Sequence, residues 1–282
     1  MDTIILDHDA VLKKLPDRLV TAHKGDFGRI LLLCGSRGYT GAAALAAMGA
    51  LRIGSGLVYL GVPKSIYTIE AGKLLEPIVF PLPDLNGKLC RTAIFRLSKI
   101  IHQMDAILIG PGLGRSDGIR NIVKWVLQHF NGSVVIDADG IFHLRDNIDI
   151  LRGRKYPSIL TPHEGEFNHL LGSKCTDRSS AAVSAANELN SIIVLKGHNT
   201  VITDGIKLFV NQTGNPGMAV GGSGDILAGM IAGLIGQGLS PLDAAACGAW
   251  IHGAAADICA EQTSMYGMLP SDMLGVIPRL LK

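Results

Sequence analysis

The stretch that decides the fold is Arg29-Ile30-Leu31-Leu32-Leu33-Cys34, followed at once by Gly35-Ser36-Arg37-Gly38-Tyr39-Thr40-Gly41-Ala42. A continuous apolar run of this length indicates a strand that is buried on both faces. The small residues after it open a helix that we predict over Gly41–Arg52, and the apolar run Leu57–Val62 predicts the next strand. A strand, a helix and a strand in this order form the repeating unit of a parallel sheet.

The same alternation continues along most of the 282 residues. Further strands are predicted at Pro77–Pro81, Asp105–Gly110, Ser133–Asp137, Ser158–Thr161, Ile192–Lys196, Thr200–Thr203 and Lys207–Val210. Helices are predicted at Ser65–Gly72, Arg91–Gln103, Ile119–Phe130, Glu164–Leu171 and Arg178–Leu189. This pattern favours an α/β fold in three layers, with a doubly wound, mainly parallel sheet flanked by helices. Residues 1–282 are expected to form a single domain, in which residues 1–24 are a lead-in segment with a short helix.

The C-terminal third is rich in small and apolar residues. A helix beginning near Ile226 carries large apolar residues on one face and Ala228, Gly229, Ala232, Gly233 and Gly236 on the other. A helix that is apolar or small all round is buried, and its small face allows close packing. Further helices are predicted over Pro241–Cys259 and Ser271–Leu281, and we expect these small-residue helices to pack between subunits.

Composition narrows the class of protein. Charged residues make up 18% and hydrophobic residues 48%, which is typical of an ordered globular chain. A net charge of +2 does not suggest a nucleic-acid surface. The longest apolar region, Ile226–Leu239, is too short to span a membrane. The acidic start and five scattered cysteines suggest a cytoplasmic protein with reduced thiols and no signal peptide.

The most informative chemical motif is Gly221-Gly222-Ser223-Gly224-Asp225, which precedes the apolar helix. The first amides of a helix have no partner within the helix, so they form a cradle for an anion. Asp225 supplies a carboxylate inside that cradle, where it is a candidate base for an attacking hydroxyl while the amides hold a phosphoryl group. The alternative is a glycine-rich turn in which Asp225 is an ordinary first-turn acid.

Other loops also follow predicted strands directly, and ligands bind beyond the carboxyl ends of strands in open α/β sheets. Gly110–Gly114 allows the close approach of a flat ring or a sugar. Asp137–Gly140 offers a carboxylate to a magnesium ion or its water shell. Within Thr161–Glu166, His163 is a candidate for a hydrogen bond to substrate and Glu166 for a metal ligand.

Two more loops complete this set. Gly35–Ala42 offers amides to a phosphate or a pyridine carboxamide, while Lys196 and Thr200 are candidates to bind a nucleotide. A simpler interpretation stays open, in which the loops are tight turns and some side chains only cap helices or pack, namely Asp139, Glu164 and His163. The chain contains no P-loop and no Gly-x-Gly-x-x-Gly motif, which argues against P-loop enzymes and Rossmann dehydrogenases.

Taken together, the ordered motifs resemble those of the ribokinase-like, ADP-dependent NAD(P)H-hydrate dehydratases from about Lys24 to the end. The segments that carry the resemblance are Lys24–Gly28, Gly35–Ala42, Gly110–Gly114, Val135–Gly140, Thr161–Glu166, Lys196-Gly197 and Asn215–Ala219 leading into Gly221–Asp225. The resemblance implies a metabolite-repair lyase that returns hydrated NADH or NADPH (the S epimer) to NAD(P)H. A nucleotide phosphorylates the ring hydroxyl and phosphate then leaves; ADP becomes AMP in bacterial and archaeal members, whereas eukaryotic members use ATP.

The resemblance also implies roles for individual residues. Asp225 is the base, and Gly222, Ser223 and Gly224 hold the transferring phosphoryl group. Contacts to the hydrated cofactor are implied for Ala42, Gly112, Gly114 and His163. Contacts to the adenine nucleotide are implied for Lys196, Gly197, His198, Asn199, Thr200 and Gly224. Mg²⁺ is the expected cofactor, with Asp137 and Glu166 as its candidate ligands.

The resemblance further implies a homotetramer. Because only about 24 residues precede the first motif, we also expect the protein to work with a separate NAD(P)H-hydrate epimerase. Two other functions stay open. One is a kinase of the same fold that acts on a hydroxyethylthiazole or a hydroxymethylpyrimidine, which would also use Asp225. The other is a non-catalytic nucleotide-binding regulator, although a pure binder has no need of a base at this position.

Overall fold

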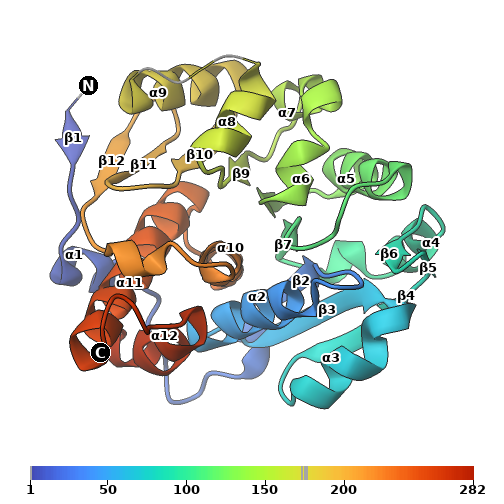
Figure 1. Ribbon diagram of the computed structural model, residues 1–282, viewed down its shortest axis with the longest axis horizontal. Helices are drawn as coiled ribbons and strands as arrows, with labels where there is room; N and C mark the ends of the chain where they lie inside the picture. The colour runs from blue at the N-terminus through green and yellow to red at the C-terminus, as the bar shows by residue number, and fades with distance from the viewer. Residues whose placement is uncertain (1, 173, 175–176) are drawn as a thin grey trace.

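The computed structural model describes residues 2–172, 174 and 177–282, and a 10-stranded sheet forms its centre (Figure 1). Across the sheet the strands are β1 (Thr3–Ile4), β12 (Leu208–Asn211), β11 (Thr200–Thr203), β10 (Ser191–Leu195), β9 (Ser158–Leu160), β8 (Ser133–Ile136), β7 (Ala106–Ile109), β2 (Arg29–Leu33), β3 (Leu57–Pro63) and β4 (Ile78–Leu82). Only β11 runs antiparallel to its neighbours among these described strands. The predicted mainly parallel sheet is therefore confirmed.

Helices cover both faces of the sheet. One layer contains α1 (His8–Leu12), α2 (Thr40–Arg52), α3 (Tyr67–Lys73), α10 (Ser223–Gly236), α11 (Pro241–Gln262) and α12 (Pro270–Val276). The other contains α4 (Ala93–Leu97), α5 (Asp117–His129), α6 (Asp139–Phe142), α7 (Asp149–Arg152), α8 (Glu164–Leu171) and α9 (Arg178–Leu189). Short 3₁₀ helices lie at Lys24–Phe27, Lys64–Ile66, Ile101–Gln103, Arg145–Asn147, Pro216–Met218 and Ile277–Leu280.

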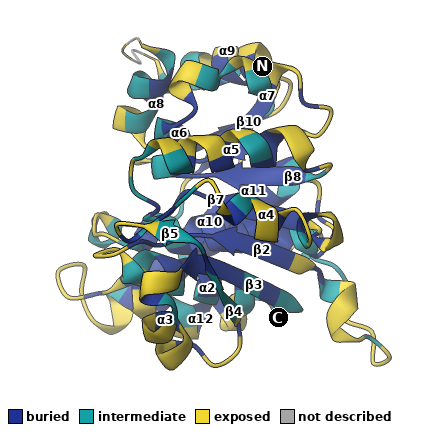
Figure 2. Cartoon of the chain, turned by 90° about the vertical axis from the view of Figure 1, so that its right-hand side faces the viewer, coloured by how far each residue is buried: buried dark blue, intermediate teal, exposed yellow. Residues whose placement is uncertain are grey.

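The apolar runs are continuous because the sheet is buried on both sides. Ile30 and Leu32 of β2 pack into the core shared with α2 and α10, while Leu31 and Leu33 pack into the core shared with α5. Figure 2 shows the central strands as buried and the outer helix faces as exposed. Burying both faces of each strand yields roughly twice the apolar area of a one-sided sheet, so the two helix layers stabilise the same strands.

Small residues let α10 approach α2 closely. A side chain at Gly229 would collide with the carbonyl oxygen of Ala46, and a Cβ atom on Gly49 would lie 2.5 Å from the carbonyl oxygen of Ile226. The predicted small face is thus used for close packing within the chain. Our expectation that it packs between subunits is wrong for α10, since Ile226–Ile235 is buried inside the molecule.

Several short elements differ from the predictions. The helix predicted over Arg91–Gln103 ends at Leu97 and is followed by a 3₁₀ turn. Before it lies an unpredicted hairpin of β5 (Asp84–Leu85) and β6 (Lys88–Leu89), whose turn residues Asn86 and Gly87 both have positive φ angles. An Asn-Gly pair is a strong signal for such a turn, so this hairpin is one that the sequence could have revealed. Among the described helices, none has the length and apolar character needed to cross a membrane.

Candidate active site

The loops after neighbouring strands meet at one edge of the sheet. The sheet order places β2 beside β7, and the chain leaves these two strands in opposite directions, which is the switch point where open α/β sheets bind ligands. The amide of Gly35 donates to the carbonyl of Pro111 at 2.8 Å, and Ser36 Oγ donates to the carbonyl of Gly112 at 2.7 Å. The loops after β2 and β7 are therefore held together as one surface.

Gly112 is a glycine because its surroundings leave no room for a side chain. Its φ angle is 62°, and a Cβ atom there would lie 2.9 Å from the Cβ atoms of both Ala42 and Tyr39. A side chain at Gly110, also at positive φ, would collide with the carbonyl oxygen of Asp137. The structure thus brings Ala42 and Gly112 together, and it joins their loops to the end of β8.

The first turn of α10 has the predicted cradle. Gly222 caps the helix with a φ angle of 105°, and the amide of Ile226 donates to the carbonyl of Gly222 at 3.3 Å. The amides of Gly224 and Asp225 precede that bond and lie outside the helix's own ladder of hydrogen bonds. The amide of Ser223 instead forms a long bond of 3.4 Å to the carbonyl of Val220. Of the predicted cradle amides of Gly222, Ser223 and Gly224, that of Ser223 is therefore already bonded, which differs from the prediction. Gly224 and Asp225, the latter not among the predicted amides, are the best placed to hold an anion.

Lys196 connects a buried and a partly buried carboxylate next to this cradle. Its Nζ donates to Oδ1 of Asp137 at 2.7 Å and lies 4.0 Å from Oε2 of Glu166. Asp137 is only 1% exposed and also accepts a hydrogen bond of 2.7 Å from Thr161 Oγ1. A Cβ atom on Gly224 would lie 3.2 Å from the lysine Nζ. Lys196 thus spans the space between the carboxylates and the helix terminus.

The environment of Asp225 suits a base. Burial and the charge of Asp137 raise the pKa of Asp225 to about 6; Lys196 opposes this rise, whereas Asp139 and Glu166 add to it. Burial lowers the pKa of Lys196, but Asp137, Glu166 and Asp225 together raise it more, so the lysine stays charged. A carboxyl group with a pKa near the working pH combines a useful ionised fraction with an effective proton acceptor.

Asp139 fixes the loop after β7. Its Oδ2 accepts a hydrogen bond of 2.7 Å from the amide of Gly114, while α6 itself is capped by Ala138. The alternative that Asp139 serves as a helix cap is therefore wrong, and so is the same alternative for Glu164, because His163 caps α8. Asp139 holds in place a glycine that the family resemblance links to the substrate.

His163 has both a structural role and an exposed surface. Its Nδ1 accepts a hydrogen bond of 3.2 Å from the amide of Glu166, and the amide of His163 donates to Glu166 Oε2 at 2.9 Å. This capping box begins α8, while 61% of the His163 side chain is exposed. His163 also pairs with Lys196 in a parallel β-bridge. The cap orients the ring, and its exposed part stays available to a ligand.

The loop 197–199 after β10 is closed by local hydrogen bonds. Thr200 Oγ1 donates to the carbonyl of Gly197 at 3.0 Å, so this hydroxyl shapes the loop. Arg178 of α9 donates to the carbonyls of His198 and Leu195, and it is not among the predicted site residues. His198 and Asn199 are exposed. No local pattern could reveal Arg178, because it reaches the loop from a different helix.

A second unpredicted residue lies beneath the cradle. His252 of α11 is 4% exposed, and its Nε2 lies 3.4 Å from Ser223 Oγ. Burial is the main cause that lowers its pKa to about 4; the bond to Ser223 opposes this shift and Lys196 adds to it. His252 is therefore neutral near pH 7 and links α11 to the start of α10. Only the folded structure brings these two distant positions together.

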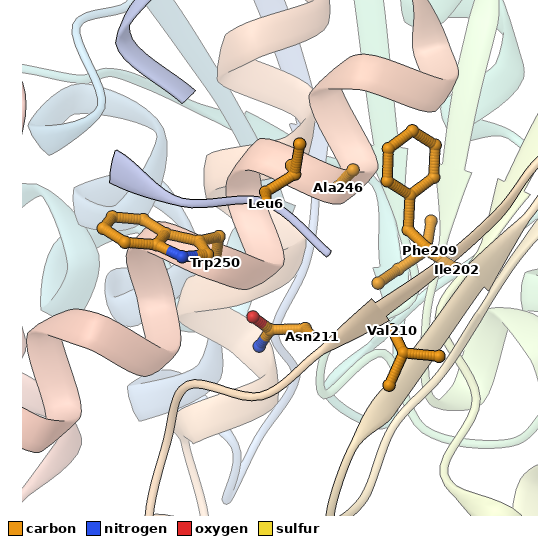
Figure 3. Close-up of a pocket in the computed structure, with 7 residues that line it drawn as sticks. All are labelled: Leu6, Ile202, Phe209, Val210, Asn211, Ala246 and Trp250. Atoms are coloured by element: carbon orange, nitrogen blue, oxygen red, sulfur yellow. The ribbon is translucent and has the colours of Figure 1, made fainter. Parts of the chain in front are cut away.

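The described residues contain no group of three or more histidine, cysteine, aspartate or glutamate side chains that could hold a metal ion. A small hollow lies between the lead-in segment, β11, β12 and α11 (Figure 3). Its volume of about 10 Å³ is room for a single water molecule at most. It is lined by Leu6, Ile202, Phe209, Val210, Asn211, Ala246 and Trp250, so it is a packing gap rather than a nucleotide site.

Two curated proteins resemble this chain over most of its length. The bifunctional NAD(P)H-hydrate repair enzyme Nnr of Moorella thermoacetica is 42% identical over 276 residues, which cover 95% of this chain and 52% of that protein. The Nnr of Gloeobacter violaceus is 37% identical over 287 residues, covering 97% of this chain and 55% of that protein. The chain thus spans about half the length of these curated relatives.

Solved structures match over nearly the whole chain. The ADP/ATP-dependent NAD(P)H-hydrate dehydratase of Bacillus subtilis, co-crystallised with ATP and Mg²⁺, superposes with a TM-score of 0.85 at 30% identity and covers 99% of this chain and 98% of its own. A ribokinase-like superfamily protein of Enterococcus faecalis has the same TM-score at 29% identity, covering 98% of this chain and 94% of its own. The family model for NAD(P)H-hydrate dehydratase matches residues 30–279. The resemblance seen in the motifs is confirmed, and the chain belongs to the NAD(P)H-hydrate dehydratase family.

Proposed function

We propose that this protein returns hydrated NADH and NADPH to their reduced, unhydrated forms at the expense of a nucleotide. The nucleotide in this proposal is ADP, which yields AMP and phosphate, with ATP as an alternative donor. The observation that carries the proposal is the position of Asp225. Its carboxyl group, with a pKa of about 6, lies in the first turn of α10 beside Lys196 and the amides of an anion cradle.

In the proposed reaction, Asp225 accepts the proton of the ring hydroxyl, and the hydroxyl oxygen attacks the terminal phosphorus of ADP. The bond from that phosphorus to the bridging oxygen breaks, and AMP leaves with the bonding electrons. The amides of Gly224 and Asp225 stabilise charge on the moving phosphoryl group. Phosphate then leaves with its C–O bonding electrons, while electrons of the ring nitrogen assist. Loss of a proton from the neighbouring carbon restores the ring double bond. Phosphorylation is needed because hydroxide is a poor leaving group, whereas phosphate leaves readily.

Lys196 has a double role in this proposal. It faces the helix terminus and is available to a nucleotide phosphate, and it also lowers the pKa of Asp225. Asp137 and Glu166 remain the proposed magnesium residues. Because Lys196 already offsets part of their charge, these two carboxylates would hold a Mg²⁺ ion only together with the nucleotide, and the bound ion would neutralise phosphate charge.

The remaining roles follow the resemblance. We propose that Ala42, Gly112, Gly114 and His163 contact the hydrated cofactor, and that the 197–200 loop contacts the nucleotide. We also propose, from the resemblance, that the protein forms a homotetramer. We further propose that it works together with an epimerase activity, since its named relatives are bifunctional repair enzymes about twice as long. Free thiols at Cys34, Cys90, Cys247 and Cys259 support a reducing cytoplasmic setting.

An absorbance assay tests the proposal. The protein is incubated with hydrated NADH, Mg²⁺ and either ADP or ATP, and the absorbance of reduced nicotinamide is followed. We expect recovery that requires the nucleotide, together with release of phosphate. Transfer of phosphate to a hydroxyethylthiazole or a hydroxymethylpyrimidine, without recovery of NADH, would instead support the kinase alternative. Nucleotide binding without any turnover would support a regulator.

A further inference from the structure

Three cationic side chains gather beside the switch point, and the proposed reaction does not use them. Arg37 follows β2, Lys88 belongs to β6 of the unpredicted hairpin, and Arg115 follows the glycine-rich loop after β7. We call these three residues the cation cluster. They come from separate segments of the chain, so only the folded protein brings them together.

Glycines bring the members of the cation cluster close to one another. A Cβ atom on Gly87 would lie 2.5 Å from Cβ of Arg37, whose amide donates to the carbonyl of Gly87 at 2.9 Å. A Cβ atom on Gly114 would lie 2.9 Å from Cε of Lys88, and Lys88 Nζ donates to the carbonyl of Arg115 at 3.2 Å. The hairpin is thus fastened to both loops of the switch point, with its lysine lying over Gly114.

The charge of the cation cluster is largely unbalanced. In the described part of the chain, Arg37 and Lys88 have no carboxylate within 4.0 Å. Arg115 has Asp139, whose Oδ1 lies 3.7 Å from its Nε, although the arginine side chain is 65% exposed. Three cations with a single carboxylate, paired to Arg115, carry a net positive charge that attracts an anion from solution.

Arg115 is also held in a defined orientation. Its guanidinium carbon lies 3.8 Å above the ring centre of Phe142, and that ring stacks on His169 at 4.9 Å. Stacking restricts the guanidinium without using its N–H groups; Nε faces Asp139, and the terminal N–H groups remain available to a ligand. A planar, oriented guanidinium matches the geometry of phosphate oxygens.

The cation cluster and the loop 197–199 follow strands that are well separated in the sheet. The sheet order separates β10 from β7 by three strand steps, or about 14 Å at the usual spacing between strands. Asp139 connects the two regions: it raises the pKa of Asp225, binds the amide of Gly114 and faces Arg115. A ligand whose ring lies at Asp225 can therefore extend along Gly112–Gly114 to the cluster while a nucleotide occupies the loop 197–199.

We propose that Arg37, Lys88 and Arg115 bind the phosphate groups of the hydrated dinucleotide. This inference rests on the proposed function, because it assigns the other end of the same substrate. Such a dinucleotide carries a pyrophosphate bridge, and its NADPH form also carries a phosphate on the adenine ribose. Both groups share the chemistry that the cluster recognises, so the experiment must distinguish them.

Direct binding measurements test the proposal without turnover. The probes are NADH, NADPH and ADP, titrated into the wild-type protein and into Arg37→Gln, Lys88→Gln, Arg115→Gln and the triple variant. Lys124→Gln is the matched control, because Lys124 is an exposed lysine on α5 outside the cluster. We expect Kd for the dinucleotides to rise about tenfold for Arg115→Gln and further for the triple variant, with ADP binding unchanged. Arg115→Lys should restore part of the affinity, and added salt should weaken wild-type binding more than triple-variant binding.

The pattern across the probes identifies the phosphate that is bound. An equal loss for NADH and NADPH assigns the pyrophosphate, whereas a larger loss for NADPH assigns the ribose phosphate. Dinucleotide binding that is unchanged in the triple variant, or a loss confined to ADP, would overturn the proposal. If the wild-type protein fails to dehydrate hydrated NADH but the variants still lose dinucleotide binding, the proposed reaction is wrong and the phosphate site stands.

Discussion

Asp225 occupies a position where its negative charge is costly. Burial and the nearby Asp137 raise its pKa from 3.8 to about 6, so the folded protein binds this proton more tightly than the unfolded chain does. The sign of the linkage follows: the stability of the fold decreases as the pH rises from about 4 to about 6, and the cost is fully present above that range. The proposed base is thus a source of instability in the fold.

This cost predicts that Asp225→Asn stabilises the protein while it removes activity. At pH 7 the free energy of unfolding should increase by up to about 3 kcal/mol, because the pKa shift no longer opposes folding. Urea unfolding at pH 7 and at pH 4 measures the effect, and the gain should disappear at the lower pH. A variant that is no more stable than the wild type at pH 7 would contradict the environment assigned to Asp225.

The charge of Lys196 sets the position of the acid limb in the pH profile. Activity should increase as the pH rises through about 6, since the proposed reaction needs Asp225 in its ionised form. Lys196→Met removes a cation that lowers the pKa of Asp225, so the limb of kcat/KM should move to higher pH, and nucleotide affinity should fall. Lys124→Met serves as the control. A limb that stays in place, or moves to lower pH, would rule out this coupling.

At the scale of single residues, the sequence predicts the site residues that lie within one contiguous motif. It misses the residues that reach the site from a different helix. Asp225 and its cradle were predictable because a helix start and its carboxylate are contiguous in the chain. His252 and Arg178 were not, because α11 and α9 bring them to the site from distant positions. Thr200 closes a loop and His163 caps a helix. Both roles depend on local geometry that residue types alone do not specify.

At the scale of elements, the contact of α10 with α2 determines where the cradle lies. Gly229→Ala places a methyl group against the carbonyl of Ala46, so the helices must separate. We expect a loss of at least about 2 kcal/mol in the free energy of unfolding, because backbone cannot yield as a side chain can. Gly275→Ala in α12 is the control, since nothing lies within 4 Å of the added methyl group.

The control variant Gly275→Ala should not lower the free energy of unfolding. Alanine is the better helix former, so Gly275→Ala should leave stability unchanged or increase it by up to about 1 kcal/mol. Chemical denaturation of both variants beside the wild type measures the difference. Equal effects of the two substitutions would contradict the close packing described for α10. A large loss for Gly229→Ala alone would support it.

Long, strongly patterned elements were predictable, and short ones were not. The predicted helix Arg178–Leu189 has the same bounds in the structure, because a capping aspartate precedes it and Asn190 ends it in a left-handed conformation. The four-residue helices α6 and α7 lack the length over which periodicity can be recognised. The β5–β6 hairpin was missed although its Asn86-Gly87 turn is a recognised signal, and that hairpin carries Lys88.

For the whole molecule, sheet topology creates the site. The alternation of strands and helices predicts a parallel sheet, and a parallel sheet brings its post-strand loops to one edge. Local sequence patterns do not predict the order of the strands, because that order depends on how the helices of both layers pack. The neighbours β2 and β7, and the cation cluster beside them, therefore emerge only from the three-dimensional arrangement.

In the proposed function, Asp225 couples phosphoryl transfer to dehydration within one active site. The most direct measurement of this coupling is the ratio of phosphate released to NADH recovered when hydrated NADH is supplied with ADP. We predict equal amounts of both products for the wild-type protein, and a loss of at least about a hundredfold in both rates for Asp225→Asn, with ADP still bound. Recovery of NADH without release of phosphate, or an Asp225→Asn variant that retains the wild-type rate, would contradict the coupling.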